Sequence, residues 1–376
     1  MTWSEEMKKK ILFLIHDLGQ GGAEKVLVNL VNNMDPEKFD ITVTDLFGGG
    51  VNAQFLKPHI RRKTWFPWEF RGNSHVMKLL TPRQLHRLIV REHYDIEVAY
   101  MEGPASRVIS GCADPDTKLV TWIHVQQNHM KSLSGSFRSP AEAQACYDRF
   151  DQAICVSEYV REDFTGILSY RKPCRVLYNT VESDKVLTLS REEAPQLLDD
   201  GAVRLVAVGS LKQSKGYHRL LACIRQLRKD GFPIHLYILG IGPQQQELER
   251  LCEEYSITDH VTFLGYDTNP YKYVAKCDLF VCASFAEGFS TAATEALIVG
   301  TPVCTVEVSG MKEMLGADNE YGLVTENNEE ALYQGIKKLL DDPALLAHYK
   351  KQAALRGRDF SAEETVRAVE EMLIKL

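Results

Sequence analysis

The chain has 376 residues, more than one hydrophobic core usually serves, so its length favours two domains of roughly 150 to 200 residues each. A formal net charge of -7 argues against nucleic acid as a partner of the whole chain. The nine cysteines are scattered without a C-x-x-C pair, which predicts buried thiols in a reducing cytosol and no structural metal. No stretch approaches the about 20 apolar residues that a membrane span requires.

Short apolar runs alternate with helical patterns along both halves of the chain. They stand at residues 11–15, 41–47, 96–101, 119–125, 152–157 and 174–179, and again at 205–210, 235–242, 261–266, 278–284, 301–306 and 322–326. This alternation is typical of α/β domains with parallel sheets. We predict a first domain over residues 1–182 and a second over 183–359, with a last helix in 360–376 that packs on either of them.

Ligands of such sheets bind where strands end and helices begin, so the strand-to-helix turns are the candidate sites. The first turn, HDLGQGGAEK, has glycines at 19, 21 and 22 and fits a phosphate cradle and an ordinary tight turn equally well. In the turn GSLKQSKG, Lys215 is either a phosphate-binding cation or a solvated surface lysine.

The stretch EGFSTAATEALIVGTP, residues 287–302, carries the strongest signal. It predicts Ser290 as the N-cap of a helix over 291–299, with Glu287 in the preceding loop and Glu295 facing outward. The backbone amides of residues 288–291 suit a phosphate, and the two carboxylates suit hydroxyl groups. The pattern therefore favours a nucleotide-sugar ligand over a capped helix with two incidental acids.

EGFSTAATEALIVGTPV resembles the signature of the retaining glycosyltransferases of family four, with its two glutamates. GQGGAEKVLVNL, GSLKQSKG, LGIGPQQQELERL and FLGYDTNPYKYVAKCDLFV resemble other blocks of that family in the expected order. The resemblance implies the GT-B fold, in which two Rossmann-like domains with parallel sheets face each other across a cleft. It is weakest between Phe47 and Asp116.

The resemblance also implies the roles of individual residues. Lys215, Glu287 and His124 would be catalytic: Lys215 neutralises the diphosphate, Glu287 holds a sugar hydroxyl and His124 contacts the donor sugar. Taken alone, His124 is more typical of a packed core histidine, and Glu102 is either an acceptor contact or a surface acid. The donor would be bound by Gly21, Gly22, Gly209, Ser210, Lys215, Gly265, Tyr266, Glu287, Gly288, Phe289, Ser290, Thr291 and Glu295, with Glu295 on the ribose and Gly265 to Asp267 near the base. Ser210 departs from the family, which commonly has an arginine there.

These features predict a retaining transferase that moves a hexose-type sugar from a nucleotide-diphosphate sugar, with UDP favoured, to a hydroxyl of a glycan, glycolipid or polyprenyl-linked acceptor in bacterial cell-surface polysaccharide synthesis. No cofactor beyond this donor substrate, no metal and no nucleic acid is expected. A non-catalytic subunit that supports an active partner is the alternative, and Ser210 is its best argument. A dehydrogenase would need a G-x-G-x-x-G turn that we do not find.

Residues 57–93 form a basic and aromatic segment. Its composition fits a surface that docks on anionic lipid, at the inner face of the plasma membrane of a cytoplasmic enzyme, and fits equally a solvated helix beside a buried aromatic loop. The segment holds two acids, Glu69 and Glu92, against the bases Lys57, Arg61, Arg62, Lys63, Arg71, Lys78, Arg83, Arg87 and Arg91, interleaved with Trp65, Phe66, Trp68 and Phe70.

Overall fold

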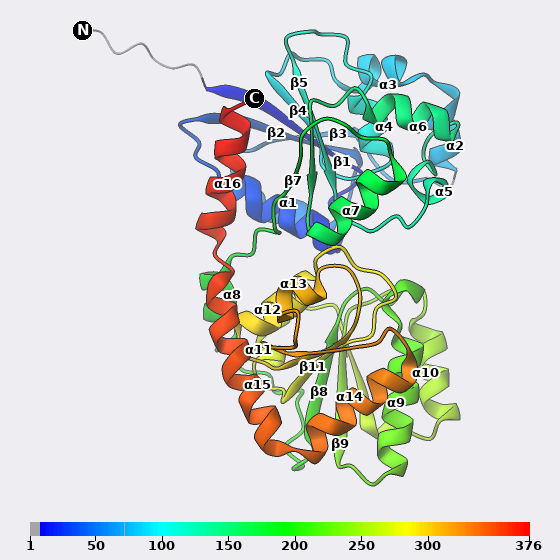
Figure 1. Ribbon diagram of the computed structural model, residues 1–376, viewed down its shortest axis with the longest axis vertical. Coiled ribbons are helices and arrows are strands. Elements are labelled where there is room, and N and C mark those ends of the chain that lie inside the picture. Colours follow the sequence, from blue (N-terminus) through cyan, green and yellow to red (C-terminus); the bar gives the residue numbers. More distant parts are fainter. Residues whose placement is uncertain (1–7, 71) are drawn as a thin grey trace, which may run out of the picture. The chain divides into compact units, whose positions relative to one another are not determined.

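The computed structural model describes residues 8–70 and 72–376 (Figure 1). The chain forms two compact units. The first contains the described residues up to Thr180 together with Ala362–Leu376, and the second contains Val181–Ser361. Arg71 of the basic segment lies outside the described residues.

The first unit is built on a parallel sheet of seven strands in the order β3-β2-β1-β4-β5-β6-β7. The central strand β1 is buried from Ile11 to Ile15, and Phe13 pairs in register with Val43 and Val98. The strands are β1 (Lys9–Ile15), β2 (Phe39–Phe47), β3 (Arg61–Phe66), β4 (Ile96–Ala99), β5 (Lys118–Ile123), β6 (Gln152–Cys155) and β7 (Cys174–Val176). An α/β domain with a parallel sheet is thereby confirmed for this half of the chain.

Helices cover both faces of this sheet. In Figure 1, α1 and α16 lie on one side, and α3, α4 and α6 gather on the other. The helices of the unit are α1 (Gly22–Asn33), α2 (Asn73–Leu79), α3 (Pro82–Ile89), α4 (Pro104–Ile109), α5 (Met130–Leu133), α6 (Pro140–Tyr147), α7 (Glu158–Ile167) and α16 (Ala362–Ile374).

The edge strand β3 was not predicted. Its sequence, RRKTWF, opens with three cations and lacks the apolar run by which we recognised the other strands. Those cations are tolerated because β3 pairs on one side only, with β2, and because Arg62 reaches the fully buried Asp45 at 2.6 Å.

The second unit has a parallel sheet of six strands in the order β10-β9-β8-β11-β12-β13, which confirms the second α/β domain. Figure 1 shows its strands between α9 and α10 on one side and α11 and α12 on the other. The strands are β8 (Val203–Val208), β9 (Ile234–Leu239), β10 (Val261–Gly265), β11 (Leu279–Cys282), β12 (Val303–Val306) and β13 (Leu323–Thr325). The helices are α8 (Ser183–Leu189), α9 (Tyr217–Lys229), α10 (Gln245–Glu254), α11 (Tyr271–Val274), α12 (Thr291–Ile298), α13 (Met311–Leu315), α14 (Glu329–Asp341) and α15 (Pro343–Arg356), with short 3-10 turns η2 to η4 at Gln213–Lys215, Thr258–His260 and Gly357–Asp359. A further 3-10 turn, η1 (Val51–Phe55), lies in the first unit.

The last helix, α16, returns to the first unit and packs against α1. The Lys9 ammonium donates to the carbonyl oxygens of Leu373 and Ile374, both at 3.1 Å. The Asp35 amide donates to Glu370 at 2.6 Å. Residues far apart in the sequence thus complete one core.

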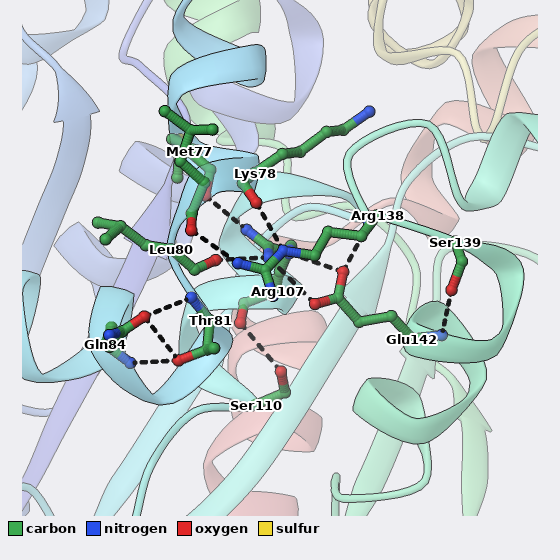
Figure 2. A network of polar contacts seen from close by, with 11 residues as sticks. Met77, Lys78, Leu80, Thr81, Gln84, Arg107, Ser110, Arg138, Ser139 and Glu142 are labelled. Carbon is green, nitrogen blue, oxygen red and sulfur yellow. Dashed lines mark hydrogen bonds and ion pairs between the residues drawn. The ribbon is translucent and has the colours of Figure 1, made fainter.

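Two arginines hold the carboxyl end of α2 in the first unit (Figure 2). Arg107 donates to the carbonyls of Met77 and Leu80, and Arg138 donates to those of Lys78 and Leu79, at 2.6 to 2.9 Å. These are four carbonyls at a helix end, where the groups lack helical partners. Glu142 joins the two arginines: it pairs with the Arg107 guanidinium and accepts from the Arg138 amide.

Among the described residues, no helix has both the length and the apolar character needed to cross a bilayer.

Candidate functional site

The turn after β8 brings several predicted residues to the carboxyl edge of the second sheet. Gly209 follows β8, and Ser210 follows Gly209. The Tyr217 hydroxyl donates to the Gly209 carbonyl at 3.0 Å, which fixes the turn against α9. Gly216 has a φ of +67°, and a Cβ there would lie 1.9 Å from the Ala283 carbonyl, so only glycine fits this position.

Lys215 and Glu287 are in direct contact. The Lys215 ammonium lies 2.6 Å from a Glu287 oxygen, which also accepts from the Ser284 hydroxyl at 2.5 Å. Burial disfavours the Lys215 ammonium, but the Glu287 charge outweighs this effect and raises the pKa of Lys215. The lysine is therefore not a freely solvated surface residue: its side chain is 28% exposed and is paired with Glu287 at the carboxyl edge of the second sheet.

Arg219 holds the loop that carries Glu287. This residue was not predicted from the sequence. It is 5% exposed on α9 and donates at 2.6 Å to the carbonyls of both Ala283 and Ser284, and at 2.8 Å to Asn327. Its guanidinium also lies 4.1 Å from the Phe285 ring centroid. These contacts hold the guanidinium against the loop between β11 and α12. Its only sequence signal is a cation on the buried stripe of an amphipathic helix.

The loop before α12 is packed closely against residues 309 and 310. The Ser309 hydroxyl donates to the Gly288 carbonyl at 3.0 Å. Gly310 has a φ of +77°, and a Cβ there would lie 2.7 Å from the same oxygen. Ser290 caps α12 as predicted, accepting from the Ala293 amide at 3.4 Å, and Thr291 is the first helical residue. Gly288, Phe289 and Ser290 are buried.

Glu295 corrects one expectation: it does not face outward but is 6% exposed. The reason is that α12 is covered by α8, α11, α15 and η4 as well as by the sheet. The Tyr271 hydroxyl lies 3.5 Å from a Glu295 oxygen. Glu295 is therefore a buried carboxylate beside a tyrosine hydroxyl.

The turn after β10 is open. Gly265 has a φ of +72°, and Tyr266 is 38% exposed. Asp267 pairs with Lys272 at 2.9 Å and accepts from the Tyr273 hydroxyl at 3.2 Å. Burial opposes ionisation of this carboxyl, but the Asn269 amide and Lys272 hold its pKa below the usual value.

In the first unit the glycine-rich turn leads from β1 into α1, with Gly21 as the N-cap and Gly22 as the first helical residue. The Gly19 amide donates to Asp17 at 2.5 Å, and Asp17 also contacts His16 at 2.9 Å. Burial lowers the pKa of His16, but the hydrogen bond and charge of Asp17 raise it more. This His16–Asp17 pair was not singled out from the sequence.

His124 follows β5 and is 5% exposed, within a cluster of aromatic rings. Its amide donates to Glu102 at 2.9 Å, and its Nε2 has no hydrogen-bond partner among the described residues. Burial raises the pKa of Glu102 to about 6, and Gln127 donates to the same carboxyl at 3.2 Å. His124 and Glu102 therefore lie together at the carboxyl edge of the first sheet.

The neutral state of His124 makes the first unit sensitive to acid. Burial lowers its pKa to about 3, whereas an unfolded histidine titrates near about 6.5. Between about pH 6.5 and about pH 3 only the unfolded chain takes up this proton, which favours unfolding. The free energy of unfolding is therefore higher at pH 8 and falls as the pH falls below about 6.5. We expect His124→Gln to remove about 2 kcal/mol of the stability difference between pH 8 and about pH 5.

Urea unfolding followed by tryptophan fluorescence measures this difference, because all four tryptophans precede residue 123. His59→Gln, at an exposed position of the same unit, is the control and should leave the difference unchanged. An equal pH dependence in wild type and His124→Gln would contradict the assignment of a buried neutral imidazole.

Two family models match the chain. The model described as Glycosyltransferase Family 4 matches residues 20–185, and the one described as Glycosyl transferases group 1 matches residues 190–356. Together they cover the whole second sheet, strands β2 to β7 of the first sheet, and every residue that the resemblance implies for catalysis or donor binding, whereas β1, His16, Asp17 and Gly19 precede the matched residues.

A full-length relative is the N-acetylgalactosamine-N,N'-diacetylbacillosaminyl-diphospho-undecaprenol 4-alpha-N-acetylgalactosaminyltransferase of Campylobacter jejuni, 32% identical over 96% of this chain and 98% of that protein. The fold is similar to that of Anabaena HepE in complex with UDP and glucose, with a TM-score of 0.79, 21% identity, and coverage of 98% of this chain and 100% of that one. It is also similar to sucrose-phosphate synthase from Thermosynechococcus elongatus, with a TM-score of 0.79, 17% identity, and coverage of 98% and 99%. The fold and the family matches together confirm the resemblance seen in the sequence: the chain belongs to glycosyltransferase family 4 and has the GT-B fold.

Proposed function

We propose that this glycosyltransferase moves a hexose-type sugar from a UDP-sugar, with retention of configuration, to a hydroxyl of a lipid-linked glycan in cell-surface polysaccharide synthesis. The observation that carries the proposal is the Lys215–Glu287 contact of 2.6 Å at the carboxyl edge of the second sheet. Lys215 supplies a positive charge for the diphosphate of the donor, and Glu287 supplies a hydrogen-bond acceptor for a hydroxyl group of the sugar.

Relatives support the two substrates. The Campylobacter relative is named for transfer to a diphospho-undecaprenol-linked sugar, and HepE was solved with UDP and glucose. A UDP-linked hexose or N-acetylhexosamine as donor and a polyprenyl-diphosphate glycan as acceptor are accordingly our first candidates. We propose no metal for the transfer step, since Lys215 provides a cation for the diphosphate.

The residues suggest how the reaction proceeds. As the glycosidic bond breaks, negative charge grows on the leaving phosphate, where the Lys215 ammonium and the amides of residues 288–291 stabilise it. Glu287 holds a hydroxyl of the transferred sugar and keeps Lys215 in place. We propose a same-face displacement in which the leaving phosphate accepts the proton of the attacking hydroxyl, with His124 contacting the donor sugar.

Binding of the donor should stabilise the protein. A ligand that binds only the folded chain raises its stability by about 2.7 kcal/mol at 100 times its dissociation constant. In a thermal-shift screen of nucleotide-sugars we expect UDP-sugars to raise the unfolding temperature more than GDP-sugars do. Lys215→Ala should abolish the shift, whereas Lys229→Ala, at the far end of α9, should preserve it.

The same screen separates the two candidate functions. A shift with UDP-sugars together with UDP release in the presence of acceptor supports the transferase. A subunit that only supports a partner would bind the donor weakly or not at all and would release no UDP. The absence of any shift across the screen would contradict the proposed donor site.

We further propose that the segment 57–93 contacts the membrane from the cytoplasmic side, but not through β3. Its cations Arg61, Arg62 and Lys63 are ion-paired within the protein, to Asp40, Asp45 and Glu92. The large apolar side chains exposed on this segment are instead Trp68, Val76, Leu79 and Leu88, which are 62%, 50%, 78% and 40% exposed. Exposed cations such as Arg83 and Arg87 stand beside them in the sequence.

Liposome flotation tests this contact. We expect the double variant Trp68→Ser/Leu79→Ser to lose most of its binding to vesicles with anionic lipid, because the two exposed side chains no longer enter the interface. The matched variant Leu187→Ser/Leu198→Ser, at residues 40% and 47% exposed in the second unit, should float like wild type. If wild-type protein does not float, the membrane contact is wrong.

A further inference from the structure

A cluster of three different metal-binding side chains lies in the first unit, away from the residues proposed for catalysis. His86 comes from α3, Glu97 from β4, and Cys112 from the turn after α4. One donor atom from each lies within 4.8 Å of the other two. We predicted no structural metal because the cysteines form no C-x-x-C pair. These three residues are separated along the chain and match no ligand motif either.

The cluster is buried. The side chains of His86 and Glu97 are 13% and 2% exposed, and Cys112 is 2% exposed. Glu97 lies inside a sheet strand, in register with Leu12 of β1 and Leu119 of β5. A carboxylate at such a position requires a cation, and within the described residues His86 is the ion-pair partner that reaches it, at 2.7 Å.

We propose that His86, Glu97 and Cys112 bind one divalent transition-metal ion of the zinc class. Imidazole nitrogen, carboxylate oxygen and thiolate sulfur are the zinc donors of proteins, at about 2.0 to 2.3 Å from the ion. Donor atoms around such an ion are about 3.4 to 3.6 Å apart, so the present spacing needs shifts of less than about 1 Å. The Cys112 thiol loses its proton on binding, and His86 gives up the proton with which it pairs with Glu97, so the metal ion replaces the imidazolium as the cation beside this carboxylate.

The site would be structural. Glu97 is the second residue of β4, whereas Glu102 and His124 stand beyond the carboxyl ends of β4 and β5. The metal would link α3 to the sheet. This link would add to the packing of Leu85, which is the buried residue of α3. The Asp114 carbonyl, 3.9 Å from the Cys112 sulfur, or a water molecule could supply a fourth donor.

The test uses the full-length chain purified without a histidine tag and treated with a chelator. We expect it to bind one equivalent of Zn²⁺, measured by elemental mass spectrometry after gel filtration. With Co²⁺ it should show the ultraviolet charge-transfer band of a cobalt–thiolate bond. Cys112→Ser should abolish that band and weaken zinc binding at least about 10- to 100-fold. Cys146→Ser removes another buried thiol of the same unit and should change neither result.

Two outcomes overturn the proposal: a wild-type protein that binds no zinc and gives no cobalt–thiolate band, or a Cys112→Ser variant that binds zinc as tightly as wild type. Tryptophan fluorescence establishes that each variant is folded. Should Cys112→Ser not fold, His86→Gln provides the same test, since it keeps the thiolate but should still weaken zinc binding. Neither readout depends on sugar transfer, so failure here leaves the proposed function untouched.

Discussion

Glu287→Gln is expected to reduce sugar transfer by at least about 100-fold, the loss typical of removing a group that stabilises a transition state. Glutamine keeps the shape of the side chain and an oxygen that accepts from Ser284. It removes the charge that lies 2.6 Å from Lys215 and that would hold a sugar hydroxyl. We therefore expect Lys215 to be held less firmly and the hydrogen bond to the transferred sugar to weaken.

Turnover is measured as UDP release and product formation with the UDP-sugar that gives the largest thermal shift. Glu247→Gln is the matched control, since it changes another carboxylate of the same unit, which contacts the His218 imidazole at 3.0 Å and whose side chain is 55% exposed. It should retain full activity. Glu287→Gln with turnover within about twofold of wild type would show that the site is misplaced.

Arg107→Met should destabilise the first unit strongly, by about 3 to 5 kcal/mol, because it leaves a partly buried charge and two helix-end carbonyls without their partner. The Arg107 side chain is 1% exposed and pairs with Glu142, which is 17% exposed (Figure 2). Although burial opposes ionisation of Glu142, the hydrogen bond from Arg107 lowers its pKa. The expected fall in unfolding temperature is roughly 6 to 20 °C for a unit of this size.

Arg138→Met is the informative comparison. Arg138 donates to two carbonyls of the same helix end, at 2.6 and 2.7 Å, but it is exposed to solvent. We expect its loss to destabilise the unit by only about 1 kcal/mol, because water replaces the lost bonds. Tryptophan fluorescence during thermal unfolding follows both variants. Equal effects of the two would mean that burial does not set the strength of this network.

Much of the fold could be predicted from the sequence because both sheets are parallel and buried, so most strands read as short apolar runs. Strand β3 was not predicted because its first three residues are cations, which a strand at a sheet edge tolerates. The loop acid Glu287, the cap Ser290 and Lys215 could be found from local pattern, since each stands where a strand ends. The burial of Glu295 could not, because it depends on α8, α11 and α15, which come from distant parts of the chain.

Contacts between residues that are far apart in the sequence could not be predicted either. No pattern places Arg219 on the carbonyls of residues 283 and 284, or His86 beside Glu97 and Cys112. Such contacts follow from which helix covers which strand, and helical periodicity gives only the face, not the neighbour. The His16–Asp17 pair is local, yet charged neighbours in a turn are too common to single out.

The return of α16 to the first unit has a consequence for biosynthesis. Residues 362–376 leave the ribosome only after all of the second unit. The first unit therefore cannot complete its folding, and the surface of α1 that α16 covers stays exposed to solvent, while some 180 residues are translated. The second unit, whose residues are contiguous, can finish folding earlier. Nonsense mutations near the 3′ end of the reading frame would therefore damage the half of the enzyme encoded at its 5′ end.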